Sequence, residues 1–261
     1  MSATTEKPAK SSSGGETVKV IVQALVLALV VRTLLFQPFN IPSGSMENTL
    51  LIGDYLFVSK YSYGYSRFSL PFSPPLFSGR IWGKEPTRGD IVVFKLPRDE
   101  STDYIKRVIG LPGDRIQMKG GVLYINDVAV PKEYVDTVDD DGVQAKRYKE
   151  TLPNGVTYHV LDREEGGAED DTKVFEVPAG NYFMMGDNRD NSTDSRVPPQ
   201  ANGVGYVPFE NLEGKATIIF FSFNEEQKHV PTQLEAVPTN HVWEIWKWPD
   251  KVRWDRIFKI L

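Results

Sequence analysis

The stretch NIPSGSMENTLLIGDYLFVSK, residues 40–60, combines a rigid turn with the start of a buried strand. Pro42 fixes its own φ and Gly44 permits backbone angles that other residues avoid, so we expect a tight, pre-shaped turn here. This turn places the hydroxyls of Ser43 and Ser45 on either side of the glycine. The apolar run YLFV that follows is typical of a buried strand. A serine on such a turn is a candidate nucleophile, but serine–glycine turns are common and the chemistry also needs a base.

The candidate base lies in DYIKRVIGLPGD, residues 103–114. In a strand, alternation places Lys106 on one face with Tyr104 and Val108, and Arg107 on the other face. Apolar neighbours disfavour the charged form of a lysine, so its pKa falls and the neutral amine becomes available near neutral pH. On this segment alone a solvated lysine on an edge strand stays open as the alternative.

Composition narrows the possible chemistry. The chain has no cysteine, which excludes disulfides, thiolate catalysis and cysteine metal sites. His159, His229 and His241 are far apart and outside any acid–hydroxyl motif, so neither a Ser-His-Asp triad nor a histidine-rich metal site is expected. The net charge of −5 shows no basic footprint for nucleic acid. These exclusions favour lysine as the base, with no metal and no nucleic acid as partner.

Four segments in order resemble the type I signal peptidase (leader peptidase) family of bacteria. They are IPSGSM at 41–46, GDIVVF at 89–94, YIKRVIGLPGD at 104–114 and MGDNRDNSTDSR at 185–196. The resemblance covers most of residues 41–221. It implies a membrane-bound serine endopeptidase with a Ser–Lys dyad and no cofactor. It also implies exported preproteins as substrates, cut after a signal peptide with small residues at the first and third positions before the bond.

Carried over position by position, the resemblance implies Ser45 as the nucleophile and Lys106 as the general base. It implies that the Ser43 hydroxyl and the Ser45 backbone N–H stabilise the oxyanion. Further residues are expected to support the site, with Ser192 closest to the lysine. These supporting residues are Tyr104, Asp187, Arg189, Ser192, Asp194 and Arg196.

The loop at 185–196 is too polar for a core and too rich in Asn and Asp for a helix. We expect its side chains to bond to one another, with Arg189 and Arg196 meeting carboxylates such as Asp187 or Asp194. Such a network would hold the lysine and its neighbours in place. The alternative is a well-bonded surface loop without a catalytic role.

One departure from the family pattern lies beside Ser45. Glu47 and Asn48 follow Met46, where the family usually has a proline before the Thr-Leu pair. We expect Asn48 to loosen the turn slightly and to leave the reacting groups unchanged.

Residues 17–36 are the candidate transmembrane anchor, since an apolar centre is flanked by Lys19 and Arg32. A cleaved signal peptide and a buried soluble helix are the alternatives. We favour an uncleaved anchor because no small-x-small cleavage site follows it. Basic residues before the anchor predict a single-pass protein of the inner (plasma) membrane, with a cytoplasmic N-terminus and the catalytic domain on the outer, periplasmic side. Ser45 would then lie at the surface of the lipid bilayer, near substrates tethered in it.

The chain is predicted to be mainly β, with an antiparallel β-sheet catalytic domain, a smaller β insertion and one preceding transmembrane helix. The predicted divisions are a disordered tail at 1–16, the anchor at 17–36, the catalytic domain at 37–118 and 174–224, the insertion (cap) at 119–173 and an amphipathic tail at 225–261.

Two segments could contact the bilayer. Residues 61–88 are rich in aromatic residues and proline, and they either dip into the membrane interface or pack as a cluster on the sheet. Near the C-terminus, Trp254, Ile257, Phe258 and Leu261 are spaced as in an interfacial amphipathic helix. The alternative for this tail is packing against the β domain.

Two rival functions remain at this stage. One is a self-cleaving repressor-type protease that shares the Ser–Lys dyad, against which the anchor and the long Asn/Asp motif argue. The other is a non-catalytic, membrane-tethered β module that binds envelope or secretion partners.

Overall fold

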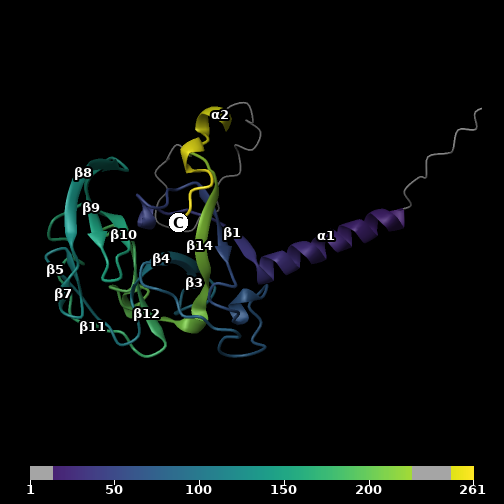
Figure 1. Cartoon of the computed structure of the whole chain (residues 1–261), viewed down its shortest axis with the longest axis horizontal. Helices are drawn as coiled ribbons and strands as arrows, with labels where there is room; N and C mark the ends of the chain where they lie inside the picture. Colours follow the sequence, from purple (N-terminus) through teal and green to yellow (C-terminus); the bar gives the residue numbers. More distant parts are fainter. Residues whose placement is uncertain (1–13, 225–247) are drawn as a thin grey trace, which may run out of the picture.

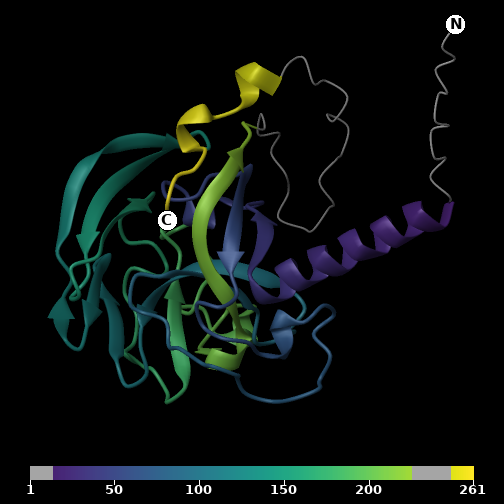
Figure 2. The same ribbon diagram turned by 45° about the vertical axis from the view of Figure 1, so that its right-hand side comes forward.

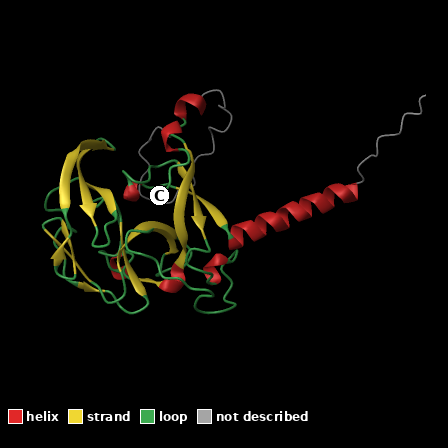
Figure 3. Cartoon of the chain, in the orientation of Figure 1, coloured by secondary structure: helices red, strands yellow, loops and turns green. Residues whose placement is uncertain are grey.

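The computed structural model describes residues 14–224 and 248–261. It consists of one long N-terminal helix followed by antiparallel β-sheets (Figures 1 and 3). The mainly-β fold class predicted from the sequence is therefore confirmed.

Helix α1, Gly14–Leu34, is exposed along its length and is long and apolar enough to cross a membrane. It projects away from the β-sheets (Figure 2). The helix includes Gly14–Glu16, which were predicted to be disordered, and Glu16 in its first turn complements the positive end of the helix dipole. At the other end, Phe36 belongs to a strand rather than to the anchor. The rest of the predicted tail, 1–13, lies outside the described residues.

The main sheet has seven antiparallel strands in the order β1-β2-β14-β3-β4-β12-β13. Strand β4 lies inside this sheet, between β3 and β12, so both of its edges are hydrogen bonded. The strands are β1 (Phe36–Asn40), β2 (Asp54–Ser59), β3 (Ile91–Lys95), β4 (Asp103–Gly110), β12 (Asn181–Met185), β13 (Val207–Pro208) and β14 (Leu212–Ser222).

Two smaller sheets lie to one side of the main sheet (Figure 1). One has the strand order β10-β9-β8 and the other has the order β11-β5-β6-β7. All their strands come from the chain between β4 and β12, while the exact limits of the insertion stay predictions. The strands are β5 (Arg115–Lys119), β6 (Val122–Ile125), β7 (Val128–Ala129), β8 (Lys132–Asp140), β9 (Val143–Thr151), β10 (Thr157–Asp162) and β11 (Phe175–Glu176).

Strand β8 runs through an acidic segment and ends at Asp140. Asp141 and Gly142 then form the turn to β9, with φ values of 58° and 79°. An Asp-Gly pair with positive φ at both residues is a favoured two-residue hairpin turn, so only this dipeptide turns the chain.

The amphipathic helix predicted at the C-terminus is wrong for the described residues. Beyond the short helix α2 (Trp248–Lys251) the chain forms only a 3₁₀ turn, Trp254–Arg256. Phe258 has φ 64°, which ends helical geometry, and its N–H donates to the Ile219 carbonyl at 2.7 Å. The end of the chain thus lies along β14. Contact of this segment with the membrane stays a prediction, and residues 225–247 lie outside the described part of the chain.

The aromatic segment at 61–88 was predicted either to pack on the sheet or to dip into the membrane interface, and it has features of both. Tyr63 and Phe68 are buried in the protein, whereas Phe72, Leu76 and Trp82 are exposed. Part of the segment therefore packs as core. The exposed apolar side chains keep the membrane contact a prediction.

A buried ion pair connects β14 with the residue that follows β2. Lys60 Nζ lies 2.6 Å from Glu213 Oε2, and neither residue is more than 2% exposed. Lys95 on β3 also approaches Glu213, with 3.4 Å between Nζ and Oε1. Removing one charge from such a pair leaves the other buried and uncompensated.

Replacing Glu213 by Gln is expected to lower the free energy of unfolding by about 3–5 kcal/mol, because Lys60 stays buried without its carboxylate. Denaturant unfolding of the full chain in detergent measures this. The double variant Lys60→Met/Glu213→Leu removes both charges and is expected to recover most of the loss. An effect of Glu213→Gln no larger than that of the exposed Glu176→Gln would contradict the role of the pair.

Candidate active site

The turn that carries Ser45 is held down by apolar packing. Gly44–Met46 form a 3₁₀ turn, and the Glu47 N–H closes it by donating to the Gly44 carbonyl at 3.0 Å. Met46 is wholly buried in a cluster that includes Ile91 of β3 and, at its margin, Ile105 of β4. Burial of the methionine therefore fixes the serine next to these two strands.

Lys106 of β4 meets this serine across 61 residues of sequence, with 2.5 Å between Nζ and Ser45 Oγ. The lysine is 3% exposed, and its Nζ donates to the Ile105 carbonyl at 3.1 Å. The Tyr104 ring centroid lies 5.5 Å from Nζ. Because β4 is an interior strand, the alternative of a solvated edge-strand lysine is wrong.

Burial sets the protonation of this amine. It lowers the pKa of Lys106 to about 8, because an ammonium group loses its hydration there. The carboxylates of Asp194 and Asp187 oppose this shift, and Arg196 adds to it. A substantial fraction of the amine is therefore neutral near physiological pH and can accept a proton.

Ser43 is the exposed serine beside the Ser45–Lys106 pair. It has an extended backbone, and its Oγ is 3.4 Å from Ser45 Oγ. The predicted role of the Ser43 hydroxyl toward an oxyanion stays a prediction.

Gly186 lets the polar loop after β12 approach the serine turn. A Cβ on this residue would lie 2.5 Å from the Ser45 carbonyl oxygen and 2.2 Å from Ser192 Oγ. A hydrogen bond joins the two segments, because the Asn188 N–H donates to the Ser45 carbonyl at 3.2 Å. Any side chain at position 186 would separate the two segments.

Asp194 and Arg196 pair with each other inside this loop, as predicted. The carboxylate is wholly buried and receives Arg196 Nε and Nη2, each at 2.9 Å, and the Gly186 N–H at 3.0 Å. Burial opposes ionisation of Asp194, but the arginine and the N–H donors hold its pKa below the usual range. The aspartate is therefore ionised and anchors the loop.

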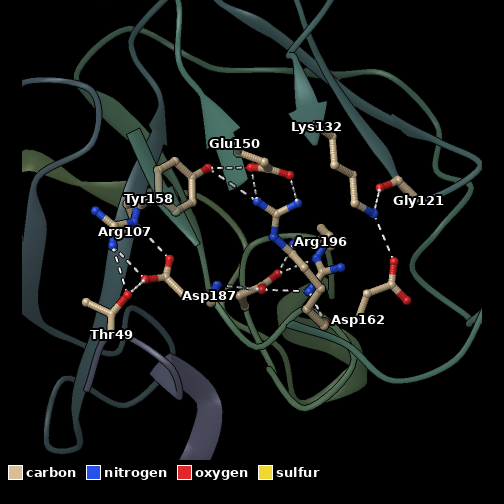
Figure 4. Close-up of polar contacts among 12 residues, drawn as sticks. Thr49, Arg107, Gly121, Lys132, Glu150, Tyr158, Asp162, Asp187 and Arg196 are labelled. Atoms are coloured by element: carbon tan, nitrogen blue, oxygen red, sulfur yellow. Dashed lines mark hydrogen bonds and ion pairs between the residues drawn. The ribbon is translucent and has the colours of Figure 1, made fainter. Parts of the chain in front are cut away.

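Arg189 does not meet Asp187. It pairs with Glu150 of β9, with distances of 2.8 and 2.5 Å from its Nη1 and Nη2 to the carboxylate oxygens. Tyr158 of β10 donates to the same carboxylate at 2.6 Å. The small three-stranded sheet therefore supplies the partner of a loop arginine. Figure 4 labels Glu150 and Tyr158 of this sheet. The prediction of a loop carboxylate was wrong for this arginine, because its partner comes from another sheet.

Asp187 instead binds Arg107, the neighbour of Lys106 on β4. Arg107 Nε and Nη2 lie 2.8 and 2.6 Å from its two oxygens, and Thr49 Oγ1 donates to it at 2.5 Å (Figure 4). Arg107 and Thr49 were not predicted as site residues. The sequence did contain a signal for Arg107, because it is the neighbour of Lys106 in a predicted strand. Alternation of side chains along that strand places Arg107 on the face opposite to Lys106.

Ser192 is buried, and its Oγ has no hydrogen-bond partner among the described residues. It lies against Gly186, next to the serine turn. Its predicted position as the residue closest to the lysine stays a prediction.

Asn48 does more than loosen the turn. Its φ is 80°, and its Oδ1 accepts a hydrogen bond from Arg147 Nη1 of β9 at 3.3 Å. Proline is locked near a φ of about −65°, so it cannot adopt this backbone conformation. A proline at position 48 would therefore require a different backbone conformation just after the serine.

Comparison with known proteins identifies the family. The family model described as "Signal peptidase, peptidase S26" matches residues 15–221. The chain belongs to the signal peptidase family. The signal peptidase I of Rickettsia typhi is 46% identical over 246 residues, covering 91% of this chain and 90% of the relative. That of Rickettsia massiliae is 45% identical over 269 residues, covering 98% and 95%.

A crystal structure of a signal peptidase I from Enterococcus faecalis is 29% identical, covers 51% of this chain and 97% of that one, and has a TM-score of 0.30. Membership of the signal peptidase family, shown by the family model and the relatives, makes the chain a serine peptidase, a hydrolase of peptide bonds. The non-catalytic β module is not favoured.

Asn48→Pro is expected to destabilise the protein by about 1–3 kcal/mol, since the proline ring forbids the observed positive φ. Asn48→Gly is the matched control, because glycine adopts a positive φ without strain. Thermal unfolding of both variants in detergent measures the difference. Equal stability of the two variants would show that the turn does not require the left-handed conformation.

Proposed function

We propose that the chain is a membrane-anchored serine endopeptidase that removes N-terminal signal peptides from exported preproteins. The nucleophile is Ser45 and the general base is Lys106. The observation that carries this proposal is the 2.5 Å approach of the buried Lys106 amine to the Ser45 hydroxyl. Membership of the signal peptidase family supports it independently.

In the first step, Ser45 Oγ attacks the scissile carbonyl carbon while its proton passes to the neutral amine of Lys106. The Ser43 hydroxyl and the Ser45 N–H donate to the developing oxyanion. When the C–N bond breaks, the protonated Lys106 gives its proton to the leaving amine. The mature protein leaves with a free N-terminus and the signal peptide remains as an ester on Ser45.

In the second step, a water molecule attacks the ester, and Lys106 accepts its proton. Collapse of the second tetrahedral intermediate breaks the ester bond, and the proton on Lys106 returns to Ser45. The chemistry of both steps is supplied by side chains of this chain, so the proposal includes no cofactor.

Substrate choice follows from an extended binding mode. An extended peptide that adds to a strand edge gains backbone hydrogen bonds, and shallow pockets beneath it select small side chains at the first and third positions before the bond. We assign this mode to the signal peptide bound beside Ser45.

The anchor determines where cleavage happens. Helix α1 ends at Leu34, only a short strand before the Ser45 turn. Basic residues near its start, Lys7, Lys10 and Lys19, favour a cytoplasmic N-terminus and a catalytic domain on the outer face of the inner membrane. Signal peptides tethered in the same bilayer would then be presented at the height of the serine.

Ser45→Ala and Lys106→Ala are each expected to lower kcat/KM by at least about 1,000-fold, because each removes one half of the dyad. The assay is cleavage of a preprotein with an Ala-x-Ala site by purified protein in detergent. Ser101→Ala and Lys119→Ala change exposed residues of the same types and serve as controls. Retained cleavage in either dyad variant, with the fold intact, would overturn the assignment.

The pH profile tests the neutral amine. Lys106 acts as a base only when deprotonated, so kcat/KM is expected to fall as pH decreases, with an ascending limb of apparent pKa about 8. Measuring kcat/KM between pH 5 and pH 10 locates this limb. An ascending limb with an apparent pKa of about 10.4, the pKa of an ordinary lysine, would contradict the argument that burial lowers the pKa of Lys106.

A further inference from the structure

The polar loop after β12 lies between the Ser45 turn and strand β10 of the small three-stranded sheet. On one side of the loop, the Leu161 N–H of β10 donates to the Asp187 carbonyl at 2.8 Å, and the Arg189 N–H donates to the Leu161 carbonyl at 2.9 Å. On the other side, the Asn188 N–H donates to the Ser45 carbonyl at 3.2 Å. The backbone at 187–189 therefore connects the small sheet directly with the backbone of the nucleophile.

Tyr158 of β10 joins the side chains that hold this segment. The Arg107 guanidinium lies over the Tyr158 ring, 4.2 Å from its centroid, and binds both oxygens of Asp187 at 2.8 and 2.6 Å. The Tyr158 hydroxyl donates to Glu150 at 2.6 Å, and Glu150 holds Arg189 at 2.8 and 2.5 Å. Figure 4 shows Tyr158 between Arg107 and Glu150. One tyrosine thus contacts the partners of the residues at both ends of the segment.

Burial prevents these groups from exchanging their partners for water. Glu150 is 0% exposed, Arg189 is 3% exposed and Tyr158 is 7% exposed. Burial and the Glu150 carboxylate raise the pKa of Tyr158 well above its ordinary value, so the hydroxyl keeps its proton and stays a donor. A buried carboxylate or guanidinium that loses a partner pays the cost of desolvation without compensation. The contacts of Tyr158 therefore favour one arrangement of the loop.

We propose that Tyr158 is a positioning residue for the nucleophile, and that it acts through Arg107 and Glu150 on the loop segment that is hydrogen bonded to the Ser45 carbonyl. This role rests on the proposed function of Ser45. The small three-stranded sheet thereby fixes where the nucleophile lies, although it brings Tyr158 to the loop rather than to the substrate.

The ionisation of Lys106 distinguishes positioning from an electrostatic effect. Burial lowers the pKa of Lys106, the carboxylates of Asp194 and Asp187 oppose this shift, and Arg196 adds to it. All three charges lie on the polar loop, and none lies on the small sheet. Loss of Tyr158 is therefore expected to displace the serine and to leave the pKa of the lysine where it is.

Kinetics of preprotein cleavage in detergent tests this expectation. Tyr158→Leu removes the ring and the hydroxyl, and we expect kcat to fall about 10- to 100-fold, because small displacements of a nucleophile are costly. We expect KM to change by less than about 3-fold, since substrate binding is not altered. The ascending limb of kcat/KM should stay at an apparent pKa of about 8. Tyr158→Phe keeps the ring beside Arg107 and is expected to recover most of the rate. A loss that appears in KM alone, or a normal kcat with a displaced limb, would overturn the proposal.

Val160→Ala is the matched control for lost stability. Val160 lies on the same strand, is wholly buried and packs in the apolar cluster between the small sheets, so its truncation weakens that packing. We expect its kcat to stay within about 3-fold of the unchanged protein under conditions where it is folded. An equal loss of kcat in Val160→Ala and Tyr158→Leu would show that the sheet contributes general stability only.

Amide hydrogen exchange tests the positioning without catalysis, in the full chain in detergent and in a Ser45→Ala background. The N–H groups of Asn188 and Arg189 are expected to exchange at least about 10-fold faster in Tyr158→Leu and to keep their protection in Val160→Ala. If Tyr158→Leu does not fold, Tyr158→Phe provides the test, with exchange about 2- to 10-fold faster for the loss of one hydrogen bond. Unchanged exchange of these two groups in the folded variant would refute the role of Tyr158. Cleavage that survives Ser45→Ala would refute the proposed function instead, and the exchange result would still decide whether the tyrosine holds the loop.

Discussion

The site depends on excluding water from the Lys106 amine where it contacts the Ser45 hydroxyl. An ammonium group loses its hydration when it is buried, so the protein must offer an environment in which the neutral form is nearly as stable as the charged one. The packing around the side chain provides this, since Lys106 is only 3% exposed. Burial of Met46 then holds the serine turn against β4, the strand that carries this lysine. Packing that excludes water therefore also sets the reactivity of the proposed base.

Around this dry pair the protein buries several full charges, and each is matched. The three arginine–carboxylate pairs are Arg107–Asp187, Arg189–Glu150 and Arg196–Asp194. Buried ion pairs add little net stability, since desolvation offsets most of the attraction. Their bidentate geometry does restrict orientation. We infer that these pairs serve to hold β4, the polar loop and the small sheet in one arrangement around the dyad.

The small three-stranded sheet is thus part of the site's framework. It supplies Glu150 to the loop arginine, Arg147 to Asn48 and Asp140 to Asn188, whose N–H donates to the Ser45 carbonyl. One of these contacts involves Asn48, the position where the chain departs from its family.

Local rules in the sequence determined the serine turn and the strand that carries Lys106, because proline, glycine and side-chain alternation act over a few residues. The order of the motifs then indicated which serine and lysine belong together. Tertiary structure alone decided that Arg189 meets Glu150, that β8 continues through an acidic run to Asp140, and that the chain ends along β14. These outcomes depend on which segments the sheets bring side by side, and pairing between distant strands leaves no periodic signal in either partner.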